Sequence, residues 1–302
     1  MYSNQLAPIV FFVYNRPTHT YKTIEALKNN KLADQSDLII YSDHAKNIEA
    51  VKEVEQVRNY IYSISGFKSI TVIERDRNWG LANSIIDGVT TVVNQYGRII
   101  VLEDDMETSP YFLSYMNDAL EYYKDELKVF GITGFAYPVN NENLPITYFM
   151  KDEGCWGWAT WSRAWQYFEK DTDYLMQIFT RQMIKDFNFD NTIDFWNQII
   201  LNSKGEINTW AIYWYATIFL KDGLFLHPKD TFVKNIGHDG SGVHCDNTNE
   251  FNSSMVEVYE KIFPMEIEVC NIAREEHKIF FSKSSIIKRI MRRIHSFLRV
   301  MK

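Results

Sequence analysis

The sequence has few cysteines, and their arrangement excludes two kinds of scaffold. Only three are present, Cys155, Cys245 and Cys270, and none of them belongs to a Cys-x-x-Cys pair. Such an odd, scattered set supports neither a disulfide framework nor a zinc ribbon, so a reducing compartment fits best. The chain is 46% hydrophobic and 15% aromatic, which is ample for a globular protein with a sizeable packed core.

Signals for export or membrane insertion are also missing. No basic segment precedes the first apolar run, and the longest apolar stretch, WAIYWYATIFL (210–220), is about half of what a membrane span needs. We therefore expect a cytoplasmic protein that does not cross a bilayer.

Acidic residues are absent from the end of the chain. Residues 278–302 hold eight of the 32 Lys and Arg residues, which leaves 24 for the rest of the chain against 39 Asp and Glu. A body with this excess of negative charge is disfavoured as a nucleic-acid binder, because phosphate attraction dominates such affinity.

Phosphate-binding loops and interdomain linkers are missing as well. The sequence contains neither GxGxxG after its first apolar run nor GxxxxGK[ST] anywhere, and no linker or repeat divides it. We expect one unit over residues 1–275, made of two halves (1–135 and 136–275) and followed by a basic tail (276–302).

What the first hundred residues do contain is a strand–helix alternation. Apolar runs rich in β-branched residues predict strands at 8–14, 37–42, 69–74 and 98–103. Helical periodicity lies between them, over 18–29, 47–63 and 79–95, and in the second of these the apolar face holds Ile48, Val51, Val54, Val57 and Ile61. This order predicts an α/β, Rossmann-like fold whose mostly parallel sheet is covered by helices on both faces.

Polar groups follow all four predicted strands. In such sheets ligands bind beyond the carboxyl ends of the strands, and here those ends gather at one edge. They carry Tyr14-Asn15-Arg16, Ser42-Asp43, Arg75-Asp76-Arg77-Asn78 and Glu103-Asp104-Asp105. The edge therefore suits a ligand that is anionic and forms hydrogen bonds.

Three consecutive acids, Glu103, Asp104 and Asp105, end the fourth strand. Their mutual repulsion and desolvation destabilise the fold unless a cation compensates them. Mg²⁺ or Mn²⁺ prefers oxygen ligands and commonly bridges one or two carboxylates to substrate phosphates. The alternative is that Asp104, Asp105 and Thr108 or Ser109 cap a helix starting near Pro110.

The motifs in this order resemble the GT-A-fold glycosyltransferases. YNRP, SD, RNWGLANSIIDGV and IIVLEDDMETSPYFLSYM are similar to segments of bacterial family 2-type enzymes and of the N-acetylglucosaminyltransferase I group, whose variant of the DxD motif reads EDD. The likeness is close over residues 8–116 and looser through GWATW to residues 237–244. It implies a metal-dependent, inverting transferase that uses a nucleotide-diphosphate-sugar, in the first place a UDP-sugar. Residues 1–135 would form its nucleotide-sugar-binding half and residues 136–275 its acceptor-binding half.

The resemblance assigns roles to individual residues. Asp105 would bind the metal directly, and Glu103 and Asp104 would fix the donor ribose and the surroundings of the metal. The nucleobase and ribose would be contacted by Asn15, Arg16 and Asp43, and the donor pocket would be lined by Arg77 and Asn78. Two local alternatives stay open: Arg16 marks a loop entering a helix capped by Thr18, and Asp43 pairs with Lys46.

A glycine-rich segment, GHDGSGVH (237–244), has two histidines. It suits a loop that closes over a substrate, with His244 or His238 completing the metal or diphosphate site. A plain surface turn is the alternative.

The resemblance fails at the catalytic base. The family's acid follows a tryptophan, but this chain reads Trp210-Ala211-Ile212 there. Glu153 and Asp194 are the candidates for the base that an inverting transfer requires. Of the nearby tryptophans, Trp158, Trp161 and Trp165 either stack on sugar rings or form one buried helix face.

The basic tail has its own pattern. Over residues 285–302, apolar residues recur at steps of three and four, with Lys and Arg mostly between them. This predicts an amphipathic cationic helix on an anionic membrane surface; a helix docked on the acidic body or used in dimerisation is the alternative.

Together these features predict a membrane-peripheral glycosyltransferase acting on a lipid-linked or surface glycan. A sugar nucleotidyltransferase is one rival, although VYNRPTHT lacks its glycine-rich loop. A binding or scaffold protein without catalysis is the other, and the missing acid near Trp210 favours it.

Overall fold

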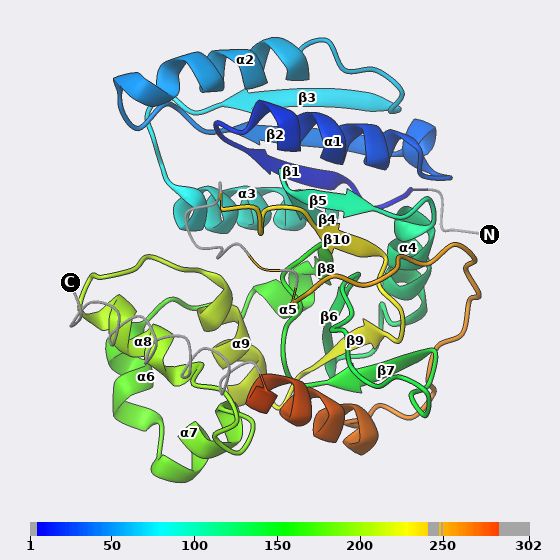
Figure 1. Ribbon diagram of the computed structural model, residues 1–302, viewed down its shortest axis with the longest axis vertical. Helices are drawn as coiled ribbons and strands as arrows, with labels where there is room; N and C mark the ends of the chain where they lie inside the picture. The colour runs from blue at the N-terminus through cyan, green and yellow to red at the C-terminus, as the bar shows by residue number, and fades with distance from the viewer. Residues whose placement is uncertain (1–4, 241–247, 249, 284–302) are drawn as a thin grey trace, which may run out of the picture.

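The computed structural model describes residues 5–240, 248 and 250–283. Its centre is an eight-stranded sheet in the order β3-β2-β1-β4-β8-β6-β9-β7, with a two-stranded sheet, β10-β5, beside it (Figure 1). The first four strands run parallel and match the predicted ones: β1 (Ile9–Val13), β2 (Asp37–Ser42), β3 (Ser69–Glu74) and β4 (Arg98–Glu103).

The helices between these strands were also predicted, and they cover both faces of the sheet. They are α1 (Pro17–Lys28), α2 (Val51–Ile61) and α3 (Leu81–Tyr96), with short 3-10 turns η1 (Ala33–Gln35) and η2 (Ile48–Ala50). Ile9, Phe11 and Val13 of β1 pack with α1 and α2, whereas Val10 and Phe12 pack with α3. Alternate side chains of one strand therefore serve two cores, as a doubly covered sheet requires.

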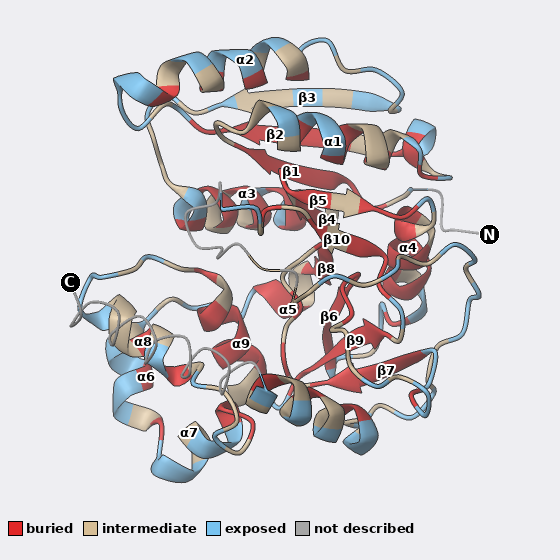
Figure 2. Ribbon diagram, in the orientation of Figure 1, coloured by how far each residue is buried: buried red, intermediate tan, exposed pale blue. Residues whose placement is uncertain are grey.

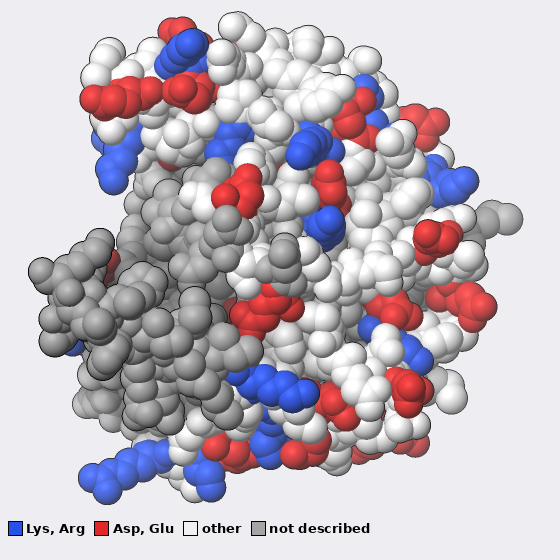
Figure 3. Space-filling view, viewed as in Figure 1, with Lys and Arg blue, Asp and Glu red and all other residues white. Residues whose placement is uncertain are grey.

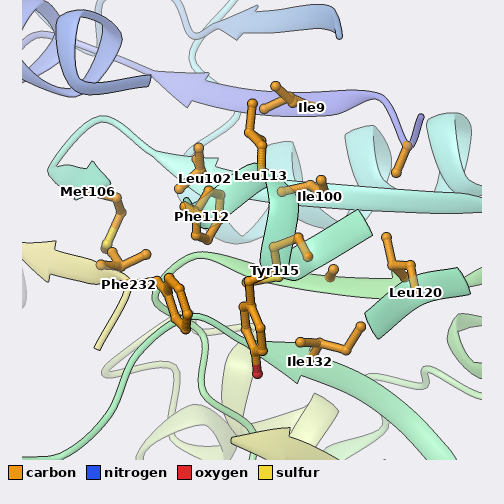
Figure 4. Packing of buried hydrophobic residues seen from close by; sticks show 14 of the residues in the cluster. Ile9, Ile100, Leu102, Met106, Phe112, Leu113, Tyr115, Leu120, Ile132 and Phe232 are labelled. Carbon is orange, nitrogen blue, oxygen red and sulfur yellow. The ribbon is translucent and has the colours of Figure 1, made fainter. Parts of the chain in front are cut away.

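The second half adds antiparallel strands and a helical layer. Its elements are β5 (Met106–Thr108), α4 (Phe112–Tyr122), β6 (Val129–Thr133), β7 (Thr147–Met150), β8 (Trp158–Trp161), α5 (Ser162–Trp165), α6 (Thr172–Ile178), α7 (Arg181–Phe187), α8 (Trp196–Ser203), α9 (Ala211–Leu220), β9 (Leu224–Pro228) and β10 (Val233–Asn235). Figure 2 shows the central strands buried and the outer faces of the helices exposed. α4 closes the first core, where its Tyr115 stacks on Phe232 with ring centroids 4.5 Å apart (Figure 4).

Two sequence expectations need correction. Ile48 is 79% exposed, because the chain there forms the 3-10 turn η2, and only Val54, Val57 and Ile61 of the predicted stripe are buried. The tryptophans at 158 and 161 lie on a strand rather than a helix, although they and Trp165 are buried in the core as one interpretation held.

A final helix over residues 271–283 packs on the body, with Ala273, His277 and Phe281 buried. The predicted division at residue 275 falls inside this helix, so the packed body continues at least to residue 283. The predicted amphipathic helix at 285–302 lies outside the described residues. Every helix among the described residues is too short or too polar to cross a membrane.

Gly88 lets α3 approach the sheet closely. A Cβ at this position would lie 2.8 Å from two ring carbons of Phe12 and 3.0 Å from Tyr41. We predict that Gly88→Ala lowers the free energy of unfolding by about 1–3 kcal/mol, because overpacking of the core outweighs the gain in helix propensity. Urea unfolding measures this. Thr91→Ala, at an exposed position of the same helix, is the control and should change stability by less than ~0.5 kcal/mol. Equal stability of Gly88→Ala and wild type would contradict the prediction.

Candidate functional site

The site lies where β1 and β4 end side by side. β1 is paired with β2 on one side and with β4 on the other, so the direction of winding reverses at this point. Open α/β sheets bind ligands at such a reversal. Asn15 and Arg16 follow β1 and the acidic triplet Glu103–Asp105 follows β4, so the topology brings these two segments together.

Arg16 contacts the acidic triplet directly. Its Nη2 donates to Asp104 Oδ1 and, over 2.8 Å, to Asp105 Oδ2. Burial alone would lower the pKa of Arg16, but the two carboxylates outweigh burial and raise it, which keeps the guanidinium charged. Asn15, beside it, is half-buried.

The acids of the triplet are only partly compensated. Burial first, then repulsion from Asp105 and Asp104, raises the pKa of Glu103 to about 8, against the opposing effect of Arg16. Burial also raises the pKa of Asp104, to about 6, although Arg16 opposes it. The second oxygen of Asp105, Oδ1, is buried and has no hydrogen-bond partner. The structure therefore presents concentrated negative charge and one unsatisfied carboxylate oxygen.

The capping alternative for these acids is wrong. A short strand, β5, follows the triplet, and α4 begins only at Phe112. The backbone amide of Tyr111 donates to Ser109 Oγ over 3.3 Å, whereas the carboxylates of Asp104 and Asp105 bind Arg16. Arg16 itself is the residue at the cap position of α1, which has no side-chain cap, so Thr18 does not serve as one.

The glycine-rich segment begins on top of Asp105. β10 pairs antiparallel with β5, and the amide of Ile236 donates to the Asp105 carbonyl over 2.8 Å. A Cβ on Gly237 would lie 2.2 Å from Asp105 Oδ2, so only glycine allows this approach. His238 packs between the rings of Trp156 and Phe251. The other predicted histidine, His244, lies outside the described residues.

The sequence analysis missed His19 as a neighbour of the site. It lies one helical turn after Arg16 on α1, its Nε2 is 3.1 Å from Asp239 of the glycine-rich segment, and its charge acts on Asp104. The sequence could have indicated His19, because it follows Arg16 by three residues and residues at this spacing share a helix face.

Asp43 fixes the loop before α3. Its carboxylate accepts hydrogen bonds from the amides of Trp79 (2.8 Å) and Gly80 (2.9 Å) and from Asn78 Nδ2 (3.1 Å). Asp43, which follows β2, therefore binds the segment that follows β3 and does not form the predicted alternative, a local pair with Lys46. Arg77 is exposed, and with Asn78 it lines a hollow of about 550 Å³ along α3 whose lining includes none of the acidic triplet.

The loop that carries Glu153 reaches the same edge of the sheet. β8 runs antiparallel to β4, with Trp158 opposite Val101, so the residues just before β8 lie near the end of β4. Burial, then the charges of Glu153 and Glu103, raise the pKa of Cys155, which places this loop within electrostatic reach of both acids. Burial and the charge of Asp152 raise the pKa of Glu153, against a hydrogen bond from its own amide.

Buried histidines hold the base of this loop. His227 Nε2 is 2.9 Å from the carbonyl of Asp152, and His277 Nδ1 is 3.8 Å from Asp152 Oδ2. Although burial opposes it, the two histidines lower the pKa of Asp152. The residue before Glu153 is therefore anchored to β9 and to the helix at 271–283.

Asp194 and Trp210 lie elsewhere. The Asp194 carboxylate accepts from Asn188 Nδ2 (3.3 Å) and from the Asn197 amide (3.2 Å) at the start of α8. Trp210 is buried and stacks on Trp158 at 5.2 Å, so the tryptophan that would precede the family's acid belongs to the core of this protein.

The acidic triplet can contribute to a metal site without forming one alone. Among the described residues, no group of three or more His, Cys, Asp or Glu side chains is arranged to hold an ion. A dication that binds nucleotide phosphates needs only one or two carboxylates, because waters and phosphate oxygens complete its shell. The partnerless Asp105 Oδ1 fits such a single contact.

Comparison with known proteins agrees with this geometry. The family model described as Glycosyl transferase family 2 matches residues 9–192, more than half of the chain. No curated protein matches the sequence.

Several solved structures are similar at low identity. A mannosyltransferase, PcManGT from Pyrobaculum calidifontis in complex with GDP-Man and Mn2+, is 9% identical over 72% of this chain and 70% of its own (TM-score 0.41). The S. aureus TarS 1–349 structure is 12% identical over 75% and 59% (0.37), and a putative glucose-1-phosphate thymidylyltransferase from Bacillus anthracis is 13% identical over 73% and 85% (0.37). These likenesses are too distant to argue a substrate. The family match and the sheet together show that the chain belongs to glycosyl transferase family 2, with the GT-A fold and a function in glycosyl transfer.

Proposed function

We propose that the protein transfers a sugar from a nucleotide-diphosphate-sugar, in particular a UDP-sugar, to a glycan acceptor, with inversion and with Mn²⁺ or Mg²⁺ bound at Asp105. The observation that carries the proposal is the buried, partnerless Asp105 Oδ1 within a triplet whose charge is incompletely compensated. Bound there, a dication would stabilise the charge that develops on the leaving diphosphate.

The protein's own residues would orient the donor around that point. Asp43 and Asn78 hold the loop before α3 rigid at the carboxyl edge of the sheet, and Asn15 and Glu103 lie at the ends of the neighbouring strands. Gly237, the first residue of the glycine-rich segment, lies against Asp105, which supports a role for this residue beside a bound diphosphate.

Glu153 is the base that we propose for the acceptor hydroxyl. Its loop leads to the edge where the donor would lie, and burial raises the pKa of its carboxyl, so its ionised form would be a stronger base than an ordinary carboxylate. Asp194, the other predicted candidate, already caps α8.

The acceptor is proposed from the charge pattern of the sequence. Residues 285–302 are basic and have periodically spaced apolar side chains. This pattern supports the proposal that the protein is cytoplasmic, binds the surface of an anionic membrane and uses a lipid-linked or surface glycan as acceptor. On the face shown in Figure 3, acidic and basic side chains of the described residues are interspersed.

Metal dependence is tested at Asp105. We expect Asp105→Asn to reduce Mn²⁺-dependent hydrolysis of a UDP-sugar about 100-fold or more, because the loss of a metal contact removes a few kcal/mol of transition-state stabilisation. The matched control is Glu107→Gln, which removes a nearby acid on β5 outside the triplet and should retain activity. Unchanged hydrolysis by Asp105→Asn would overturn the proposed metal role.

The base is tested by comparing the two candidates. Glu153→Gln should lower kcat by about 10²- to 10⁴-fold with little change in KM for the donor, as expected for the loss of a general base. Asp194→Asn should retain the wild-type kcat when the rate is expressed per folded protein. The reverse result would assign the role to Asp194.

The charge of the triplet predicts a pH dependence of stability in the metal-free protein. With a pKa of about 8 in the folded state and 4.5 as the reference value, Glu103 keeps a proton on folding that the unfolded chain has released. The free energy of unfolding should therefore fall as pH rises from 4.5 to 8, by at most ~1.4 kcal/mol per pH unit for one proton.

Glu103→Gln should lack this component, so its stability relative to wild type should grow across that range and level off above pH 8. Urea unfolding in the presence of EDTA at several pH values measures the difference. Parallel curves for the two proteins would show that Glu103 does not titrate in this window.

A further inference from the structure

We propose that Arg16 is a built-in counter-ion of the metal-free site, which competes with the dication for Asp105 and turns to the donor diphosphate when the dication binds. This inference rests on the proposed metal-dependent use of a nucleotide diphosphate. It adds a coupling, in which metal and donor each favour the binding of the other because a single guanidinium moves between two anionic partners.

The contacts of Arg16 support the competition. One nitrogen, Nη2, binds both Asp104 Oδ1 and Asp105 Oδ2, and the two carboxylates are only 7% and 6% exposed. A dication bound to Asp105 would bring two further positive charges next to this guanidinium in a poorly hydrated place, where like charges repel strongly. Full occupancy by both cations is therefore unfavourable.

Arg16 is placed so that its head group can move while its backbone stays fixed. Its carbonyl accepts the Thr20 amide at 2.9 Å in the first turn of α1, and Pro17 follows it. The side chain is 19% exposed, so its head group has access to solvent. A guanidinium presents a fork of donors that matches phosphate oxygens.

Gly237 packs against the same ion pair. A Cβ on Gly237 would lie 2.2 Å from Asp105 Oδ2 and 3.0 Å from Arg16 Nη1, so this residue contacts both members of the pair. Movement of the Arg16 head group would therefore change the surroundings of Gly237.

Arg98 provides a contrast within the same protein. It lies at the start of β4, at the opposite end of the strand from the triplet, and its Nη1 is 2.9 Å from Glu121. Because its side chain is 16% exposed and the acidic triplet is not its partner, Arg98 serves as a matched control for the loss of a partly buried arginine.

The experiment is calorimetric titration of the full chain with Mn²⁺ alone and then with UDP in saturating Mn²⁺. We expect Arg16→Gln to bind Mn²⁺ at least about ten-fold more tightly than wild type and to bind UDP more weakly, and Arg98→Gln to match wild type in both. Equal or weaker Mn²⁺ binding by Arg16→Gln would overturn the inference.

A second pair of variants guards against misfolding, because Arg16→Gln leaves two buried acids without their cation. In the background of Asp104→Asn, adding Arg16→Gln should again tighten Mn²⁺ binding about ten-fold, with Asp105 retained. If wild type binds Mn²⁺ and UDP but no Arg16 variant binds Mn²⁺ more tightly, only the competition fails. If no protein binds Mn²⁺ even with UDP present, the proposed metal-dependent function fails with it.

Discussion

The contact of the Arg16 guanidinium with Asp104 and Asp105 joins residues that are 88 and 89 positions apart in the sequence, at the point where β1 and β4 end side by side. Bringing three acids to the end of a buried strand is energetically unfavourable, and the neighbouring groups of the site compensate only part of their charge. Arg16 offsets part of the charge, the N-terminus of α1 adds its positive dipole end, and one oxygen of Asp105 is left over. Under the proposed function, a dication together with a phosphate of the donor would neutralise the charge that remains at this site.

The antiparallel half of the sheet brings the remaining groups to this corner. β8 reverses direction against β4 and so carries the Glu153 loop to the edge where the acids lie. β10 pairs with β5 immediately after the triplet and seats Gly237 on Asp105. His227 of β9 lies 2.9 Å from the Asp152 carbonyl, and His277 of the helix at 271–283 lies 3.8 Å from its carboxylate, so that helix packs against the base of the Glu153 loop. The match to glycosyl transferase family 2 spans residues 9–192 and so covers the parallel strands and β8 alike.

The local sequence pattern predicted the secondary structure correctly where burial of apolar side chains alone determines it. The strands and helices of the first hundred residues were predicted because alternation and helical periodicity record burial directly, as in β1 and α3. The pattern failed where tertiary contacts decide. Trp158, Trp161 and Trp165 have helical spacing, yet Trp158 and Trp161 lie on β8, because pairing with both β4 and β6 makes that segment a strand buried on both faces. Ile48 has the spacing of a core residue but lies in a 3-10 turn and is exposed.

The sequence by itself determined the α/β fold, the edge of the sheet where polar groups collect, and the acids that mark it, because each depends on residues close together in the chain. Only the tertiary structure decided which charges meet. That Arg16 binds the triplet, that His19 faces Asp239, that Asp43 secures the loop before α3, and that the loop before β8 leads to the end of β4 all depend on strand order and on antiparallel pairings. Electrostatic partners are selected by distance in space, and residue spacing along the chain carries little information about it.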